Sequence, residues 1–206
     1  MVRTHSTMLP IGTEMPPFDM DIVPGLVFSV GSSFEGLKKL NNDLLSNKPT
    51  LFMIICAHCP FVKHIETEIT SLFKDYGESV QFIAVCSNSV ITHPQDGPEH
   101  LAKQANSNGW QFPYLTDDDQ TFAKSLKAAC TPDFYLFSGL NDKANKLRYR
   151  GQLDESTPGN NIPITGNSLR TALDYLLAGT QLKEDQKPSL GCNIKWHPGK
   201  EPAWFG

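Results

Sequence analysis

The chain has no apolar run approaching the roughly 18 residues that a membrane-spanning helix needs. Its first segment, Met1 to Pro10, also lacks the apolar core of a secretory signal. Lysine and arginine never cluster beyond a local pair, and the formal net charge is -4, which argues against a nucleic acid or an anionic membrane as partner. We therefore expect a cytoplasmic protein that binds neither nucleic acid nor membrane.

Cysteine is also scarce, and its five positions are Cys56, Cys59, Cys86, Cys130 and Cys192. An odd number of cysteines, in a chain too long to depend on disulfides for its core, argues against a structural disulfide framework. Cys86 lies inside an apolar, strand-like run and is assigned to the core. In a reducing compartment we expect Cys56 and Cys59 as a dithiol that cycles to a disulfide during turnover.

The length of 206 residues fits a single domain, residues 1–206, with a sizeable core. The tail, residues 180–206, is rich in proline and glycine, yet it also carries large apolar groups such as Ile194, Trp196 and Trp204. A disordered tail seldom holds so many of them, so we expect the tail to pack on the domain.

The most informative stretch runs from Leu51 to Tyr76. Leu51 to Ile55 is an apolar run that predicts a buried strand, and from Phe61 onward apolar residues recur at helical spacing. Cys56 and Cys59 stand at this junction, three positions apart, so their sulfurs can meet on one face of the first helical turn. The N-terminus of a helix favours a thiolate, and the pattern is therefore typical of thiol–disulfide chemistry.

Hydrophobic periodicity and turn signals predict further elements on both sides of this stretch. Before it, we expect an extended segment that ends in a hairpin with 26–30, and then a helix over 34–45. After it, a strand over 80–86 and a helix over 99–106 complete a strand-helix-strand-helix unit, which implies parallel pairing. The remaining predicted elements are a short strand at 112–115, a helix capped by 117–119, strands at 134–137 and 147–150, and a helix over 169–177.

The Cys-x-x-Cys at a strand-to-helix junction, Thr131-Pro132 before a later hairpin, and a final helix together resemble the thioredoxin fold. The chain is most similar to the peroxiredoxin-like redoxins of the alkyl hydroperoxide reductase/thiol-specific antioxidant (AhpC/TSA) superfamily, over roughly Pro10 to Gly179. The tail Gly191 to Trp196 is similar to that of a group within it that carries Cys-x-x-Cys. The resemblance implies a thioredoxin-like α/β fold, with a central mixed sheet flanked by helices, an N-terminal hairpin extension and a C-terminal aromatic tail.

The resemblance also implies residue roles. In thioredoxins the proline matching Pro132 is cis and packs beside the disulfide, where it and neighbours such as Thr131 hold a substrate strand. By the same analogy Cys56 is the exposed nucleophile and Cys59 resolves the mixed disulfide. Pro60, however, favours the first helical position, which would make Cys59 a solvent-facing N-cap residue. We predict Cys56 as the nucleophile and keep Cys59 as the alternative.

The chain departs from the peroxidase pattern of the superfamily, Pro-x-x-x-Thr-x-x-Cys. When Cys59 is aligned with the peroxidatic cysteine, Cys56 replaces the threonine and Phe52 replaces the proline. A second interpretation is nevertheless a thiol peroxidase, in which Cys59 becomes a sulfenic acid and Cys56 condenses with it. Arg148 and Arg150 are the candidates for the arginine that orients peroxide, and ordinary surface arginines are the alternative.

A third interpretation is a metal-binding module that uses Cys56, Cys59 and a histidine. A structural metal site would need a second Cys or His pair at ligand spacing, and the sequence lacks one. We therefore expect no metal and no cofactor. The first interpretation remains a thiol–disulfide oxidoreductase that acts on thiol or disulfide proteins or small molecules and is served by an external reductant.

Further residues are candidates for a supporting role. A partly protonated His58 between the two cysteines would favour a thiolate and make the pair more oxidising than thioredoxin, unless the ring simply faces solvent. Cys130 and Cys192 are candidate additional redox thiols, although free cysteines usually only fill space. The polar segment Gly151 to Thr165 is either a functional flap or an inert surface insertion.

Overall fold

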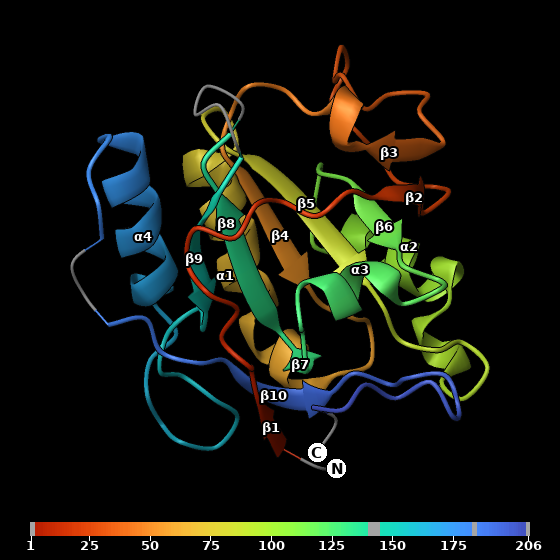
Figure 1. The fold of residues 1–206 in the computed structure, drawn as a ribbon. Helices are drawn as coiled ribbons and strands as arrows, with labels where there is room; N and C mark the ends of the chain where they lie inside the picture. The colour runs from red at the N-terminus through yellow and green to blue at the C-terminus, as the bar shows by residue number, and fades with distance from the viewer. Residues whose placement is uncertain (1–2, 140–144, 183–184, 205–206) are drawn as a thin grey trace.

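The computed structural model describes residues 3–139, 145–182 and 185–204. A seven-stranded sheet with the order β3-β2-β6-β5-β4-β8-β9 forms its centre (Figure 1). The strands are β2 (Asp19–Ile22), β3 (Lys39–Asn41), β4 (Thr50–Ile54), β5 (Gln81–Cys86), β6 (Tyr114–Thr116), β8 (Asp133–Phe137) and β9 (Leu147–Gly151). β4, β5 and β6 are parallel, whereas β8, β9, β2 and β3 pair antiparallel, so the sheet is mixed. This is the thioredoxin-like α/β fold that the resemblance implies.

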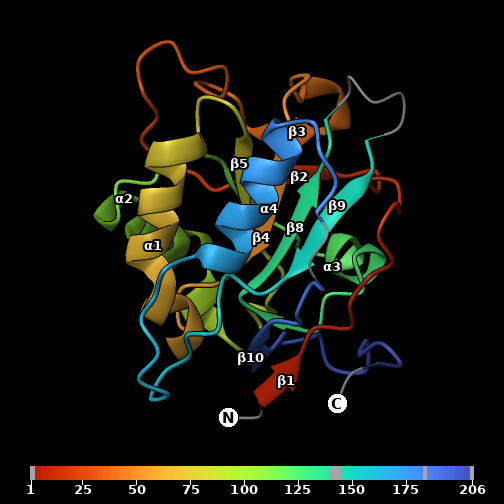
Figure 2. The same cartoon turned by 90° about the vertical axis from the view of Figure 1, so that its left-hand side faces the viewer.

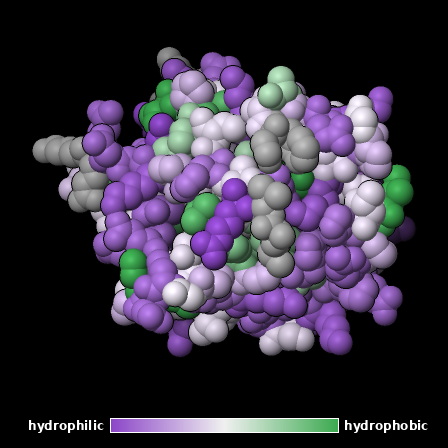
Figure 3. All heavy atoms as spheres, turned by 90° about the horizontal axis from the view of Figure 1, so that it is seen from below, coloured by the Kyte–Doolittle hydropathy of each residue, from purple (hydrophilic) through white to green (hydrophobic). Residues whose placement is uncertain are grey.

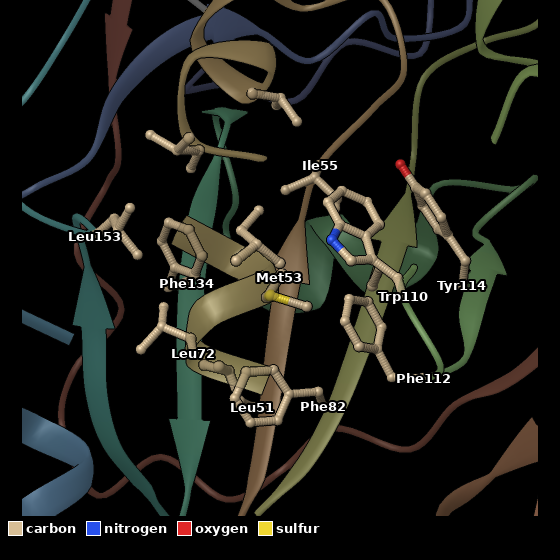
Figure 4. Close-up of a cluster of buried hydrophobic side chains, with 14 of the residues drawn as sticks. Leu51, Met53, Ile55, Leu72, Phe82, Trp110, Phe112, Tyr114, Phe134 and Leu153 are labelled. Carbon is tan, nitrogen blue, oxygen red and sulfur yellow. The ribbon is translucent and has the colours of Figure 1, made fainter. Parts of the chain in front are cut away.

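Helices cover both faces of this sheet, as Figures 1 and 2 show. On one face lie α1 (Pro60–Tyr76), α2 (Pro98–Ser107) and α4 (Asn167–Leu177), and on the other lies α3 (Thr121–Ser125). Because side chains alternate along a strand, β4 supplies both cores. Leu51 and Met53 belong to the core under α1, α2 and α4, whereas Phe52 and Ile54 belong to the core under α3. Figure 4 shows part of the first core, where side chains of neighbouring strands surround Met53.

A second, three-stranded sheet lies at the lower end of the molecule in Figure 1. It consists of β1 (Arg3–His5), β10 (Leu190–Asn193) and β7 (Cys130–Thr131), with β10 in the middle and all pairs antiparallel. This sheet brings the tail beside the segment that precedes Pro132. Farther along the tail, Ile194 and Trp196 are buried in the core under α3.

Helix α1 begins where the sequence predicts it. Pro60 occupies its first turn, since a proline there removes no helical hydrogen bond, and the helix ends at a Gly77 cap. Its buried residues follow the predicted helical spacing and are Phe61, Val62, Ile65, Ile69 and Leu72. The predicted strands before and after α1 are present as β4 and β5, and they pair in parallel as expected.

The N-terminal prediction is wrong in part. β2 does form a hairpin, but its partner is β3 and not residues 26–30. The helix expected over 34–45 is absent, and only the 3-10 helix η1 (Asn42–Leu44) follows β3 there. Gly36 has a φ of +79°, a left-handed conformation that interrupts any helix. Leu40 instead belongs to β3, and its side chain is buried. The apolar spacing thus reflects two core side chains, Leu40 in β3 and Leu45 after η1, and not the face of a helix.

Within the described residues, no helix is both long and apolar enough to cross a membrane. Figure 3 looks onto the end of the molecule that carries β1 and β10. The coloured part of that face is largely hydrophilic, with hydrophobic side chains in small separate patches.

Candidate redox site

Cys56 and Cys59 lie in the short connection between β4 and α1, at the lower end of the sheet in Figure 1. Cys59 is the N-cap residue of α1, with extended backbone angles (φ -68°, ψ 123°), and Pro60 follows it in the first turn. The prediction of an N-cap cysteine is therefore confirmed. The solvent exposure expected for Cys56, and for Cys59 in the alternative, is wrong, because both residues have 0% of their surface exposed.

Thr131 contacts both sulfurs of the pair. Its peptide bond to Pro132 is cis, as the resemblance implies. The Cys59 thiol donates a hydrogen bond to the Thr131 carbonyl oxygen at 3.3 Å, and Cys56 Sγ lies 3.7 Å from Thr131 Oγ1. The structure thus brings together the two motifs that the sequence analysis singled out, although they are more than seventy residues apart.

The two sulfurs have opposite electrostatic environments. Hydrogen bonds from the Cys192 and Cys56 thiols are the largest causes that lower the pKa of Cys59. The Thr131 carbonyl favours the neutral thiol, so the lowered pKa is the net result of opposing contacts. Burial raises the pKa of Cys56 well above its ordinary value, and the hydrogen bond with Cys59 adds to this. A single negative charge on the pair therefore favours Cys59, which opposes the prediction that Cys56 is the nucleophile.

His58 is paired with a carboxylate that the sequence analysis did not single out. Its Nδ1 lies 2.5 Å from Asp96 Oδ2 and 3.8 Å from Cys56 Sγ. Because both partners face the same ring nitrogen, Asp96 takes the short hydrogen bond and Cys56 only a long contact. The His58 backbone N–H also donates to Asp96, and the ring stacks on His93 with centroids 5.4 Å apart.

Asp96 itself is 1% exposed and ends the 3-10 helix η2 (Pro94–Asp96) in the loop after β5. Burial acts to raise its pKa, but hydrogen bonds from His58 and from Asn88 Nδ2, at 2.8 Å, lower it overall. No motif marks Asp96 in the sequence, since it lies 38 residues from His58. The only available signal was an acidic residue within a polar loop that starts at the carboxyl end of a central strand.

The Cys56, His58 and Asp96 side chains could also hold a metal ion, because their sulfur, nitrogen and oxygen donors lie within 4.8 Å of one another. Zinc accepts this mixture of donors. The predicted ligand set of Cys56, Cys59 and a histidine is not the one assembled here, since Asp96 takes the third position.

The two candidate additional thiols differ in their contacts. Cys192, on β10, forms a hydrogen bond with Cys59 that raises the pKa of Cys192, and burial raises it further. Cys130, on β7, has its sulfur 3.8 Å from the Pro132 carbonyl oxygen, and burial raises its pKa well above the ordinary value. Cys86 is 4% exposed within β5, which confirms its assignment to the core.

The candidate peroxide-site arginines both lie on β9. Arg150 donates from Nε to the Leu9 carbonyl oxygen at 2.9 Å and from Nη1 to Gln186 Oε1 at 2.8 Å. These bonds tie Arg150 to the N-terminal segment and to the tail, whereas Arg148 has an exposed side chain. A role for either arginine in peroxide binding stays a prediction.

The loop from Gly151 to Thr165 is organised around Asp154. Its carboxylate accepts hydrogen bonds from the backbone N–H groups of Ser156, Thr165 and Gly166 at 2.7–2.8 Å. The Ser156 hydroxyl also lies 2.8 Å from Nε2 of His64 on α1. Asp154 thus joins the two ends of the loop to each other, and Ser156 connects the loop to α1. A gating role stays a prediction.

Comparisons with known proteins agree with this architecture. The crystal structure of an uncharacterized conserved protein from Geobacillus kaustophilus is 44% identical, with a TM-score of 0.84, and the match covers 97% of this chain and 98% of that one. A hypothetical protein from Sinorhizobium meliloti 1021 is 33% identical, with a TM-score of 0.83 and coverage of 95% and 100%. Mycobacterium bovis AhpC, 14% identical with a TM-score of 0.55 and coverage of 86% and 98%, shares the fold.

Among curated proteins, a search finds no match to the chain. The model of the AhpC/TSA family matches residues 11–151, which is more than half of the chain and includes both cysteines of the pair and Pro132. Its structural neighbours also include a disulfide oxidoreductase and the peroxidoxin BcpB, both from Mycobacterium tuberculosis. The chain belongs to the AhpC/TSA family.

Proposed function

We propose that the protein is a thiol–disulfide oxidoreductase that cycles Cys56 and Cys59 between dithiol and disulfide. The observation that carries this proposal is the buried pair of cysteines at the N-terminus of α1, with Thr131 in contact with both sulfurs. The proposed substrates are thiol or disulfide proteins or small molecules in the cytoplasm. An external reductant closes the cycle, and no cofactor takes part.

The reaction proceeds by two exchanges at sulfur. One sulfur of the pair attacks a substrate disulfide and forms a mixed disulfide, and the substrate's other sulfur leaves as a thiolate. The second sulfur of the pair then displaces the substrate. The protein ends with a Cys56–Cys59 disulfide, and the substrate has gained two electrons and two protons. The reverse sequence oxidises a substrate dithiol.

The environment of each sulfur suggests its part in this cycle. Cys59, with its lowered pKa, carries the negative charge of the reduced pair, whereas Cys56 keeps its proton. His58 Nδ1 lies 3.8 Å from Cys56 Sγ, but it donates its hydrogen to Asp96, so this nitrogen does not accept the Cys56 proton while that pair is intact. Because neither sulfur is exposed, a substrate reaches the pair only when a covering segment moves.

A second candidate is a thiol peroxidase with Cys59 as the peroxidatic residue. The lowered pKa of Cys59, its N-cap position and Pro60 after it favour this candidate. In that reaction the Cys59 thiolate takes one oxygen from a peroxide, which leaves as an alcohol or water. Cys56 then condenses with the sulfenic acid and releases water, and the same disulfide results.

One experiment separates the two candidates. Fully reduced protein is mixed in turn with stoichiometric hydrogen peroxide and with oxidised glutathione, and the disulfides are mapped by mass spectrometry. For the oxidoreductase we expect a Cys56–Cys59 disulfide from glutathione and a peroxide rate no faster than that of a free thiol. A peroxide rate orders of magnitude faster, lost in Cys59→Ser, would favour the peroxidase.

Cys86→Ser provides a matched control, because Cys86 is also buried but lies within β5. It should leave both rates unchanged. If neither oxidant produces a Cys56–Cys59 disulfide in the wild-type protein, both candidates fail.

A further inference from the structure

Cys59 is the central sulfur of three. The Cys192 thiol and, after it, the Cys56 thiol are the largest causes that lower the pKa of Cys59. Cys56 precedes it on the same connection, but Cys192 arrives from the opposite end of the chain, on β10. A third thiol therefore acts on Cys59, the sulfur that carries the negative charge when the pair is reduced.

The strand pairing fixes Cys192 in this place. Cys192 lies opposite Thr131 in the antiparallel pair of β10 and β7, and the Thr131 carbonyl oxygen is 3.3 Å from Cys59 Sγ. On its other edge β10 pairs with β1, where Arg3 lies opposite Cys192. The Arg3 guanidinium in turn lies 5.9 Å from the centre of the Phe61 ring on α1. The strand with Cys192 is thus held from both sides against the start of the helix.

Gly191 permits this close approach. A Cβ at position 191 would lie 2.1 Å from the Thr131 carbonyl oxygen and 2.6 Å from its carbonyl carbon. Only a residue without a Cβ lets β10 pass so near to the backbone of Thr131. The residue next to Cys192 is therefore the one that allows its strand to reach the cysteine pair.

Cys130 offers an internal comparison. It is also buried and adjacent to Thr131, yet its partner across the strands is Asn193, and its sulfur faces the Pro132 carbonyl oxygen at 3.8 Å. Both cysteines are thus close to Thr131, but Cys192 is the one that lies opposite Thr131 across the strands and lowers the pKa of Cys59.

We propose that Cys192 is a third redox cysteine, which takes over the disulfide from Cys56 and Cys59 as a Cys59–Cys192 bond. The proposal rests on the proposed function, because it needs the Cys56–Cys59 disulfide as its starting state. The Cys192 thiolate attacks Cys59 Sγ, the bond between Cys59 and Cys56 breaks, and a bond between Cys59 and Cys192 forms. Cys56 leaves as a thiolate and takes up the proton that Cys192 lost, so no electrons enter or leave the protein.

The exchange changes which thiol is free. With the bond on Cys59 and Cys192, Cys56 regains its thiol beside His58 Nδ1, while β10 becomes covalently tied to the start of α1. Cys56 is then available to a further thiol or disulfide, even though the protein as a whole remains oxidised by two electrons.

The test uses the full chain, reduced and then oxidised with one equivalent of oxidised glutathione. Free thiols are blocked with N-ethylmaleimide in denaturant at low pH, and the disulfides are mapped by mass spectrometry. We expect a wild-type population with a Cys59–Cys192 bridge and a blocked Cys56. In Cys192→Ser, blocking of Cys56 in the oxidised protein should fall at least tenfold, whereas Cys130→Ser should retain it.

Cys56→Ser gives an independent readout, because it should still form the Cys59–Cys192 bridge with one equivalent of oxidant. Circular dichroism identifies any variant that fails to fold, and Cys192→Ala replaces Cys192→Ser if that variant is one of them. The disulfide map of the wild-type protein depends on neither variant. Two results together would overturn the inference and leave the proposed function intact. The first is a wild-type protein in which the Cys56–Cys59 disulfide is the only one found, and the second is a Cys56→Ser variant in which glutathione stays bound to Cys59. Absence of any Cys56–Cys59 bridge in Cys192→Ser would instead overturn the proposed function.

Discussion

His58 Nδ1 lies 2.5 Å from Asp96 Oδ2, and this contact determines the charge beside Cys56. A protonated histidine alone would favour a thiolate on Cys56 and a more oxidising pair, as predicted from the sequence. The Asp96 carboxylate opposes that effect: after burial and the Cys59 hydrogen bond, its charge also raises the pKa of Cys56. The histidine of the motif is therefore compensated by a buried anion.

The first prediction concerns the stability of this pair. His58→Ala would leave the buried Asp96 with Asn88 as its remaining side-chain partner, and it should cost about 2 to 3 kcal/mol of unfolding free energy. Asp96→Asn removes the charge that needs a partner, so the double variant should be more stable than His58→Ala by at least about 1 kcal/mol. Urea unfolding followed by circular dichroism at neutral pH measures both differences.

The pH dependence follows from the direction of the Asp96 shift. Its pKa is lowered from 3.8, so its contribution to stability is present above that value and is lost as the pH falls through the folded-state pKa. The coupling between His58 and Asp96 should therefore shrink in acid. His93→Ala, which removes only the ring stacked on His58, is the control and should change stability by less than about 0.5 kcal/mol. If the losses of unfolding free energy in His58→Ala and Asp96→Asn simply add in the double variant at neutral pH, the pairing of His58 with Asp96 is contradicted.

The second prediction concerns Thr131, whose side chain contributes to the lowered pKa of Cys59. Thr131→Val keeps the β-branched shape but removes the hydroxyl, so the pKa of Cys59 should move up toward its ordinary value. The midpoint of the pH profile of Cys59 alkylation by iodoacetamide should then move up by about one pH unit, which corresponds to about 1.4 kcal/mol for one hydrogen bond to a charged group. The rate is followed by mass spectrometry as a function of pH.

Thr50→Val is the matched control for this change. Thr50 is a buried threonine of β4, and within the described residues its hydroxyl has no hydrogen-bond partner. The same substitution should therefore leave Cys59 alkylation unchanged and keep or increase stability. Equal effects of the two variants on Cys59 would mean that Thr131 acts through packing alone.

The central part of the fold could be predicted because local and tertiary signals agree there. Leu51 to Ile55 is apolar enough for a strand buried on both faces, and Pro60 with the following apolar spacing marks a helix start. In the N-terminal segment the local and tertiary signals disagree. Leu40 sits at helical spacing but is held in β3 by its pairing with β2, and such pairing between distant segments leaves no periodic trace.

The site shows the same division. Cys56, Cys59 and Thr131-Pro132 form short motifs that a single sequence displays. Asp96 and Cys192 reach the site only through the path of the loop after β5 and the pairing of β10 with β7. Each comes from a segment far from the cysteine pair in the sequence, so no spacing rule could have placed it there.

The third prediction concerns Asp133, which follows Pro132 and is fully buried. Burial raises its pKa from 3.8 to about 7, although hydrogen bonds from the Tyr135 hydroxyl at 2.7 Å and the Phe134 N–H at 3.1 Å act in the opposite direction. The folded state thus holds a proton that the unfolded chain releases. Its contribution to stability is complete below about 3.8 and is lost as the pH rises to about 7.

At about 1.4 kcal/mol per pH unit, that loss is on the order of 4 kcal/mol. Asp133→Asn carries no charge at any pH, so its stability relative to wild type should increase between about pH 4 and about pH 8. Chemical unfolding at a series of pH values measures the difference. Asp43→Asn, at an exposed position of η1, controls for the loss of one negative charge. A difference between Asp133→Asn and wild type that stays constant over this range would show that Asp133 is ionised in the folded protein.

The fourth prediction concerns the position of β10 beside β7. In Gly191→Ala the added Cβ would meet the Thr131 carbonyl group, which is backbone and cannot turn aside as a side chain can. β10 must then move away from β7, at a cost of about 1 to 3 kcal/mol. Cys192 moves with it, and since its hydrogen bond is the largest cause that lowers the pKa of Cys59, that pKa should rise. Thermal unfolding and the pH profile of Cys59 alkylation measure the two effects.

Gly199→Ala separates this steric effect from backbone strain. Gly199 lies in the same tail with a φ of +75°, and no heavy atom lies within 4 Å of the Cβ that alanine would add. It should therefore cost about 1 to 2 kcal/mol through its left-handed backbone alone. Cys59 should keep its pH profile in this variant, because β10 stays in place. If both variants lose similar stability but only Gly191→Ala changes Cys59, then the position of β10, and not the stability of the tail, controls the thiolate. An unchanged Cys59 profile in Gly191→Ala would instead mean that Cys192 does not hold the charge on Cys59.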